Sequence, residues 1–91
     1  MRQFQFTLFI AGESPRSQRA IANLRRIAQE RLGGDYELTV VDLSRSPALA
    51  SQHQILAAPT LVRELPLPER KFIGDMSDGD RILRGLDVVA A

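Results

Sequence analysis

Apolar and polar residues alternate at the start of the chain and again after residue 35. Apolar side chains occupy every second position from Phe4 to Ile10, and the run becomes fully apolar over residues 8–11. A second alternation covers residues 36–41. A period of two is typical of β-strands, because successive side chains point to opposite faces of a sheet. The pattern predicts a central first strand and a second strand that ends at Val41.

The stretch between these two strands has the period of an α-helix. Ser14 stands before Pro15, the order expected of an N-cap and a first helical residue, and Gly33 and Gly34 provide the left-handed conformation that commonly ends a helix. Between these limits the apolar residues recur at helical spacing: Ala20, Ile21, Leu24, Ile27, Ala28 and Leu32. We predict a helix over residues 15–32, which joins the two strands as a right-handed, parallel βαβ unit.

The second half of the chain predicts a short helix, two strands and a final helix. Ser46-Pro47 repeats the cap-then-proline signal, and Pro66-Leu67-Pro68 forces a turn between two runs of strand-forming residues. A last group of apolar residues returns to helical spacing. The first of these helices is predicted from 47 to about 54, and the antiparallel strands over 60–65 and 70–74. The final helix has Gly79 near its start, after Ser77 and Asp80 at the spacing of a capping box, and runs to residue 89. The whole chain, residues 1–91, is expected to be one βαβαββα domain.

Pro59 interrupts the apolar stretch over residues 55–62 and opens the third strand. Proline is tolerated at the first position of a strand, and a cis peptide before proline costs only about 0.5–1 kcal/mol. A cis proline that opens an antiparallel strand beside a helix N-terminus is the fixed feature of the thioredoxin-like fold. A trans proline that ends a helix is the alternative. Because the element order is also the thioredoxin-like one, we expect an α/β, thioredoxin-like fold with a cis Pro59.

Composition and charge exclude several classes of function. The chain has 12 basic and 11 acidic residues, a formal net charge of +1, which argues against charge-driven binding to nucleic acid. No apolar run approaches the ~20 residues that span a membrane, and the N-terminus lacks the pattern of a signal peptide. Without cysteine there is no disulfide and no thiol chemistry. We expect a cytoplasmic protein that binds neither nucleic acid nor membrane.

No group of residues has the spacing of a catalytic or metal site. Thioredoxin-like enzymes place Cys-x-x-Cys at the N-terminus of the first helix, where this chain has Ser14-Pro15-Arg16-Ser17. Serine cannot exchange disulfides, but Ser14 is able to hydrogen-bond a glutathione thiol; the other interpretation is a helix cap. The single histidine, His53, has no further ligands near it and is expected at the surface. Asp42 is expected to be a turn acceptor. We therefore expect no enzyme, cofactor or metal.

Two residues of the final segment oppose helix formation. Gly85 lies inside the predicted helix, where glycine costs about 1 kcal/mol relative to alanine. Asp87 lies near its C-terminus, where the helix dipole disfavours an anion. Conflict between local preference and fold often marks function, and ordinary imperfection of a marginal helix is the alternative.

Short motifs in a fixed order extend along nearly the whole chain. They are Leu8-Phe9-Ile10-Ala11-Gly12, Ser14-Pro15 with Ser17 and Arg19-Ala20, Asp42, Ile55-Leu56-Ala57-Ala58-Pro59-Thr60-Leu61, Leu65-Pro66-Leu67-Pro68, Ile73-Gly74-Asp75 with Ser77, and Gly85-Leu86-Asp87. Each is weak alone, but together and in order they are specific. The sequence resembles the KaiB family of circadian-clock proteins.

The resemblance implies a function that composition does not reveal. KaiB proteins bind the ATPase KaiC and help to time its phosphorylation cycle without catalysis of their own. They are metamorphic: a tetrameric ground state has a rearranged C-terminal half, and a rare thioredoxin-like monomer binds KaiC. The family's KaiC-binding positions correspond to Arg2, Arg19 and Lys71, and its fold-switch positions to Gly85 and Asp87. The resemblance leaves open whether KaiA or a clock-output kinase is a further partner, and whether this chain forms a homo-tetramer or a dimer.

Overall fold

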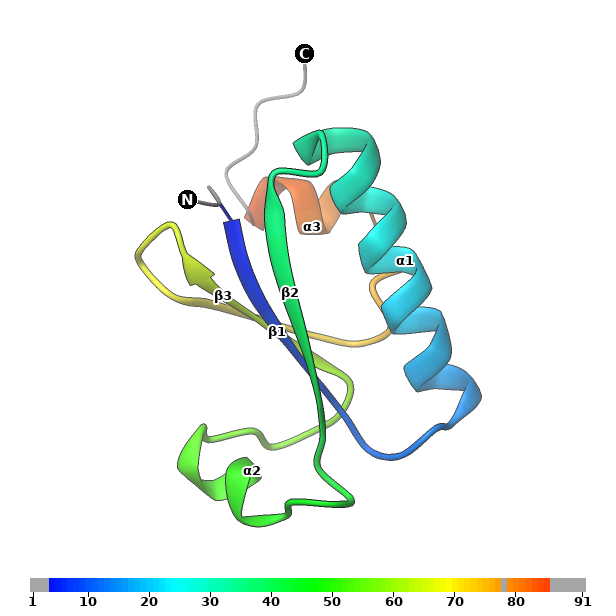
Figure 1. Cartoon of the computed structure of the whole chain (residues 1–91), viewed down its shortest axis with the longest axis vertical. Helices are drawn as coiled ribbons and strands as arrows, with labels where there is room; N and C mark the ends of the chain where they lie inside the picture. Colours follow the sequence, from blue (N-terminus) through cyan, green and yellow to red (C-terminus); the bar gives the residue numbers. More distant parts are fainter. Residues whose placement is uncertain (1–3, 78, 86–91) are drawn as a thin grey trace.

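The computed structural model describes residues 4–77 and 79–85, and its elements follow the predicted order (Figure 1). They are β1 (Phe4–Ile10), α1 (Pro15–Leu32), β2 (Tyr36–Asp42), α2 (Ala48–Gln52), β3 (Thr60–Leu65), β4 (Arg70–Ile73) and α3 (Gly79–Gly85). The strands form one sheet in the order β2-β1-β3-β4, with β1 parallel to β2 and antiparallel to β3, and β4 antiparallel to β3. The predicted α/β class and βαβαββα order are confirmed.

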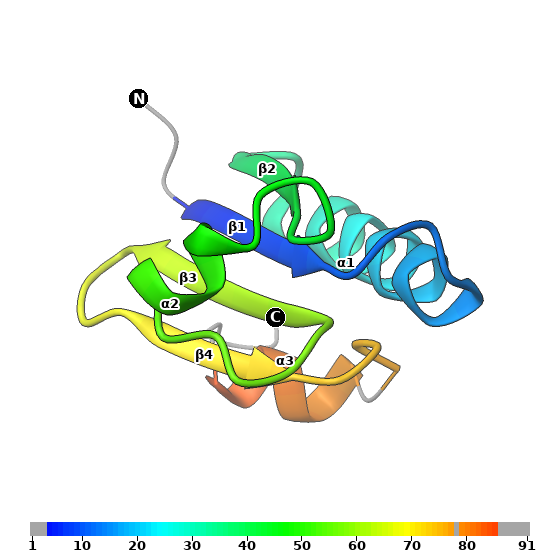
Figure 2. The same cartoon turned by 90° about the horizontal axis from the view of Figure 1, so that it is seen from below.

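Helices lie on both faces of this sheet (Figures 1 and 2). We call the face beneath α1 and α3 the inner face and the face beside α2 the outer face. Alternate residues of a strand reach opposite faces, so Leu8 joins the large inner core, whereas its neighbour Phe9 joins a smaller outer cluster. In β3, Leu61 and Val62 divide in the same way. The fully apolar end of the first strand therefore results from burial on both faces.

The inner core joins both halves of the chain. Its buried members are Phe4, Phe6, Leu8, Ile10, Ala20, Leu24, Ile27, Leu61, Phe72, Met76 and Ile82. Burial of each leucine, isoleucine, methionine or phenylalanine side chain among them contributes about 1.5–3 kcal/mol to the stability of the fold. The helix α1 contributes the three apolar residues of its central turns, which is the face that the helical spacing predicts. The core therefore fixes α1 and α3 against the same side of β1, β3 and β4.

Several bounds differ from those predicted by one or two residues. The helix α2 ends at Gln52 rather than near Gln54 and buries no residue of its own, and Ile55 is buried only after that helix has ended. The strand β4 ends at Ile73, because Gly74 adopts a φ of +123°, which only glycine reaches easily. The helix α3 begins at Gly79, which is also near the start of the predicted final helix.

The peptide bond between Ala58 and Pro59 is cis, as predicted. Two further cis bonds, Leu65–Pro66 and Leu67–Pro68, lie in the turn between β3 and β4 and were not predicted. The buried side chain of Arg63 contacts this turn, because its Nη2 donates a hydrogen bond of 2.7 Å to the carbonyl oxygen of Pro68. At the other end of the hairpin, the carbonyl of Pro59 accepts from the backbone N–H of Gly74 at 3.0 Å.

Candidate functional site

Ser14 is the N-cap of α1. Its Oγ accepts a hydrogen bond from the backbone N–H of Ser17 at 3.1 Å and donates one to Ser17 Oγ at 3.0 Å. This is the usual way in which a serine satisfies a free N–H of the first helical turn. Of the two interpretations of Ser14, the helix cap is therefore the one that the geometry supports. The proton of its hydroxyl and one of the two lone pairs are already used within the chain.

Asp42 organises the turn after β2. Its Oδ1 accepts hydrogen bonds from the backbone N–H groups of Gly12 and Ser44, both at 2.9 Å, and from Ser44 Oγ at 2.7 Å. The hydroxyl of Ser44, followed by these two N–H groups, holds the pKa of the Asp42 carboxyl below its ordinary value, because all three favour the ionised form. Asp42 is thus a turn acceptor, as predicted, and it joins the ends of β1 and β2.

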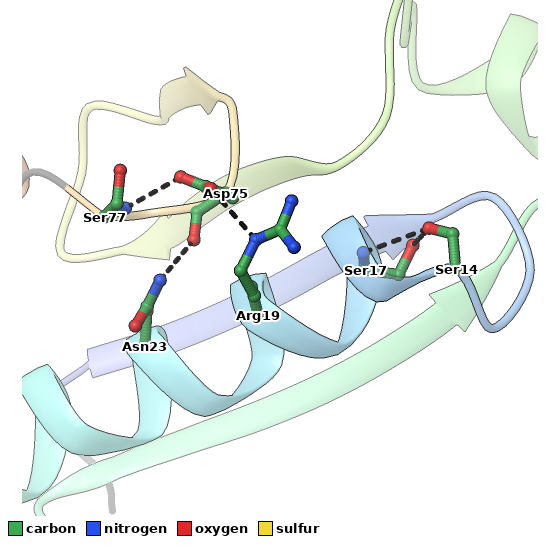
Figure 3. Close-up of polar contacts among 6 residues, drawn as sticks. All are labelled: Ser14, Ser17, Arg19, Asn23, Asp75 and Ser77. Carbon is green, nitrogen blue, oxygen red and sulfur yellow. Dashed lines mark hydrogen bonds and ion pairs between the residues drawn. The ribbon is translucent and has the colours of Figure 1, made fainter.

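A small set of polar contacts joins α1 to the segment after β4 (Figure 3). Arg19 Nε lies 3.5 Å from Asp75 Oδ2, and Asn23 Nδ2 donates to the carbonyl oxygen of Asp75 at 2.9 Å. Asp75 Oδ1 also accepts from the backbone N–H of Ser77 at 3.1 Å. We call Arg19, Asn23 and Asp75 the clasp. The hydrogen bonds of Ser77, followed by the contact with Arg19, lower the pKa of the Asp75 carboxyl.

The two described residues of the predicted partner surface lie on different sides of the sheet. Arg19 belongs to α1, on the inner side, and its side chain is 59% exposed. Lys71 lies on β4, where its Nζ reaches the outer side and donates to the carbonyl oxygens of His53 at 3.0 Å and Gln54 at 3.5 Å. The structure does not bring the two side chains together, and a partner that contacts both must reach both sides of the sheet. Arg2, the third predicted residue, lies outside the described residues.

Gly85 lies against the ring of Phe72. A methyl group placed on Gly85 would overlap this ring and would come within 2.6 Å of its Cζ. Phe72 belongs to the inner core and is only 8% exposed, so the ring is confined. Glycine at this position thus has a packing reason, beyond the helix propensity considered from the sequence. Asp87, the other predicted fold-switch residue, lies outside the described residues.

Sequence reasoning missed the density of cations on α1. This helix carries five arginines and one glutamate: Arg16, Arg19, Arg25, Arg26, Arg31 and Glu30. No acidic residue lies in its first turn, where the helix dipole would favour one. Of the five arginines, only Arg19 forms an ion pair with another described residue. The arginine count was visible in the sequence, and only the exposure of these residues needed the structure.

His53 caps the C-terminal end of α2 and is exposed, as predicted. Its ring packs beside Phe9, with 5.3 Å between the ring centroids. Across residues 4–77 and 79–85 no three His, Asp or Glu side chains gather in a way that suits a metal ion. None of the helices within these residues is long and apolar enough to cross a membrane.

Comparison with known proteins places the chain in a family. The family model described as the KaiB domain matches residues 7–88. The chain belongs to the KaiB family. The circadian clock protein KaiB3 of Synechocystis is 44% identical over 89 residues, which cover 98% of this chain and 87% of that protein. The circadian clock oscillator protein KaiB of Synechococcus elongatus is 45% identical over 82 residues, which cover 90% and 80%. The resemblance noted in the sequence is thereby confirmed.

Solved structures confirm the thioredoxin-like fold of this KaiB-family chain. The N-terminal domain of SasA from Synechococcus elongatus superposes with a TM-score of 0.77 at 18% identity, over 96% of this chain and 86% of that domain. Mitochondrial thioredoxin 3 from Saccharomyces cerevisiae superposes with a TM-score of 0.72 at 19% identity, over 96% and 79%. At such low identity these likenesses concern the fold alone.

Proposed function

We propose that this KaiB-family chain is a non-enzymatic circadian-clock regulator that binds a KaiC-type ATPase ring and modulates its phosphorylation cycle. The observation that carries the proposal is the match of residues 7–88 to the KaiB domain, together with 44% identity to a clock protein over 98% of the chain. The position that holds the reactive cysteine in thioredoxin-like enzymes carries Ser14, whose hydroxyl is already bonded to Ser17. These observations favour binding over catalysis.

The proposed partner surface includes Arg2, Arg19 and Lys71. Arg19 remains more than half exposed despite its contact with Asp75, and Lys71 is exposed at the β4 edge. Because the two lie on different sides of the sheet, the surface that we propose is the β4 edge with its flanks, rather than one flat face. Loss of a charge from such a surface typically slows association with the partner and makes the binding less dependent on salt concentration.

We further propose that the thioredoxin-like state competes with a second, rearranged state, and that Gly85 and Asp87 govern the balance. Two packings of one sequence that differ by a few kcal/mol are what a fold switch requires. In the thioredoxin-like state the clasp joins α1 in the first half to Asp75 in the second half. A rearranged C-terminal half has to give up these contacts and the packing of Phe72 against Gly85.

The alternative function is glutathione binding at Ser14, and a titration separates it from the clock role. The thiol would need the hydroxyl of Ser14, which now bonds both the N–H and the Oγ of Ser17. Glutathione is titrated while amide spectra are followed for residues 12–17 and 57–60. Saturable shifts in both segments would support the alternative and argue against the clock role.

The direct test uses a KaiC-type ring from the same genome, with ATP present. The association rate and the dissociation constant are measured for the parent, for Lys71→Ala and for Arg31→Gln as a matched control at the far end of α1. We expect Lys71→Ala to weaken binding by about 1–3 kcal/mol, the loss for a charge pair that is partly buried in the complex, and the control to bind as the parent does. Adding KaiA or a clock-output kinase to the preformed complex then tests for a further partner. If Lys71→Ala binds as well as the parent while its amide spectrum is unchanged, the proposed surface is wrong.

A further inference from the structure

A hollow with a volume of about 170 Å³ lies on the outer face of the sheet, beside α2. It arises because α2 has only five residues and covers only part of this face. Its floor is apolar: Phe9 and Val62 are 2% and 5% exposed, and Val41 lies next to them. A concave apolar floor bordered by a few polar groups is the usual form of a small-molecule site.

Three charged side chains border this hollow and do not pair with one another. They are Glu64, Glu69 and Lys71. The ammonium of Lys71 donates to the carbonyl oxygens of His53 and Gln54, and Glu64 Oε1 accepts a short hydrogen bond of 2.6 Å from the hydroxyl of Thr7. Neither glutamate forms an ion pair with any residue in the part of the chain that the structure describes. Two glutamates therefore line one hollow, whose single ammonium is directed at the end of α2.

This arrangement leaves an excess of negative charge above an apolar floor. The two carboxylates and the one ammonium of the border sum to −1. The exposed ring of His53 lies 5.3 Å from the buried ring of Phe9 and adds apolar surface to the same wall. A cation beside two carboxylates relieves their mutual repulsion. The charge of the border therefore favours a cationic ligand.

We propose that the hollow binds a free small organic cation, with an ammonium or guanidinium group on an apolar body. The cationic group lies beside Glu64 and Glu69, and the apolar body packs against the accessible parts of Val41, Leu49 and His53, which line the hollow. The volume of about 170 Å³ lies below the roughly 300–1,000 Å³ of pockets for drug-sized ligands, which suits a smaller ligand. The site is separate from the proposed clock function and does not depend on it, although Lys71 borders both surfaces.

The test uses three probes that share a phenyl ring and differ in charge: benzylammonium, benzyl alcohol and benzoate. Each is titrated into the full chain at constant ionic strength, since salt would otherwise screen the charges, while amide spectra report on Phe9, Val41 and Val62. We expect benzylammonium to give saturable shifts with a dissociation constant of about 1–10 mM. Benzyl alcohol should bind more weakly by up to about five-fold, which corresponds to the loss of one partly exposed charge contact. Benzoate should bind more weakly still.

Two glutamine variants and one control locate the cationic group. Glu69→Gln removes one charge from an exposed side chain, and Glu64→Gln keeps an oxygen that can accept from Thr7. Each is expected to weaken benzylammonium binding about five-fold. Glu30→Gln on α1, on the other side of the sheet, is expected to leave binding unchanged. The proposal is overturned by any of three results: no saturable shifts at about 50 mM benzylammonium, equal or tighter binding of benzyl alcohol or benzoate, or unchanged binding in Glu69→Gln.

Discussion

The contact between Gly85 and Phe72 gives the sharpest test of how the thioredoxin-like state is balanced. Gly85 is the last residue of α3 that the structure describes, and replacing a helical glycine by alanine stabilises a helix by at most about 1 kcal/mol. Here the new methyl group would overlap the confined ring of Phe72, and overpacking of a core costs about 1–3 kcal/mol. We therefore expect Gly85→Ala alone to change the free energy of unfolding by between about 0 and −2 kcal/mol. In a Phe72→Leu background, where the ring is gone, the same change should stabilise by up to about 1 kcal/mol.

The measurement is a double-mutant cycle by urea unfolding, followed by circular dichroism, with amide spectra to verify the fold of each variant. The expected coupling energy is about 1–3 kcal/mol, the range found for residues in direct contact. Gly79→Ala in the same helix is the control, because a methyl group there would meet Ile27 at an ordinary 3.8 Å. It should show no coupling to Phe72→Leu. A coupling below about 0.5 kcal/mol for Gly85 would refute the packing argument and leave helix propensity as the whole effect.

Three further predictions concern polar contacts. Ser14→Ala should destabilise the fold by about 1 kcal/mol and Ser14→Asp by much less, because aspartate also caps helices. Thermal unfolding measures both, and equal losses of stability in the two variants would contradict the role of Ser14 as a helix cap. In urea unfolding, Asn23→Ala should lower the free energy of unfolding by about 1 kcal/mol, because it removes a part-buried hydrogen bond of the clasp. Arg19→Ala should lower it less, since the ion pair of Arg19 is exposed. A larger loss in Arg19→Ala than in Asn23→Ala would contradict the clasp as described. The lowered pKa of Asp42 means that its stabilisation is present above the ordinary value of about 3.9 and is lost as pH falls through the lower folded value. Stability measured from about pH 6 to pH 2 should therefore fall less steeply in Asp42→Asn than in the parent, with Glu13→Gln as an unchanged control.

The sequence was sufficient wherever the determinant is local. Ser14-Pro15 and Gly33 fixed both ends of α1, because caps act within one turn of the helix. The period of two placed β1, and the element order around Pro59 led to the cis bond. The predicted α2 is too long because Ile55 fits the apolar spacing of this helix. In the structure Ile55 follows the end of the helix and packs with Phe9 and Val62.

Contacts between residues that are far apart in the chain could not be predicted from the sequence. The bond from Asn23 to the carbonyl of Asp75 joins residues 52 positions apart, and neither residue has a pattern that indicates the other. The overlap at Gly85 depends on where Phe72 places its ring. The face on which Lys71 lies could have been predicted from the sequence. Strand alternation puts it on the face opposite to its buried neighbour Phe72. Applied to β4, that rule would have separated Lys71 from the α1 side in advance.

The clock assignment itself is tested most directly by the mass of the assembly that the chain forms with a KaiC-type ring. The parent is incubated for a day at micromolar concentration with the ring from the same genome and ATP, and the products are weighed by native mass spectrometry. The account predicts a complex heavier than the ring by whole copies of this 10.1 kDa chain, which forms faster when the thioredoxin-like state is favoured. A spectrum that holds only the free ring and the free chain, with both proteins folded, would contradict it.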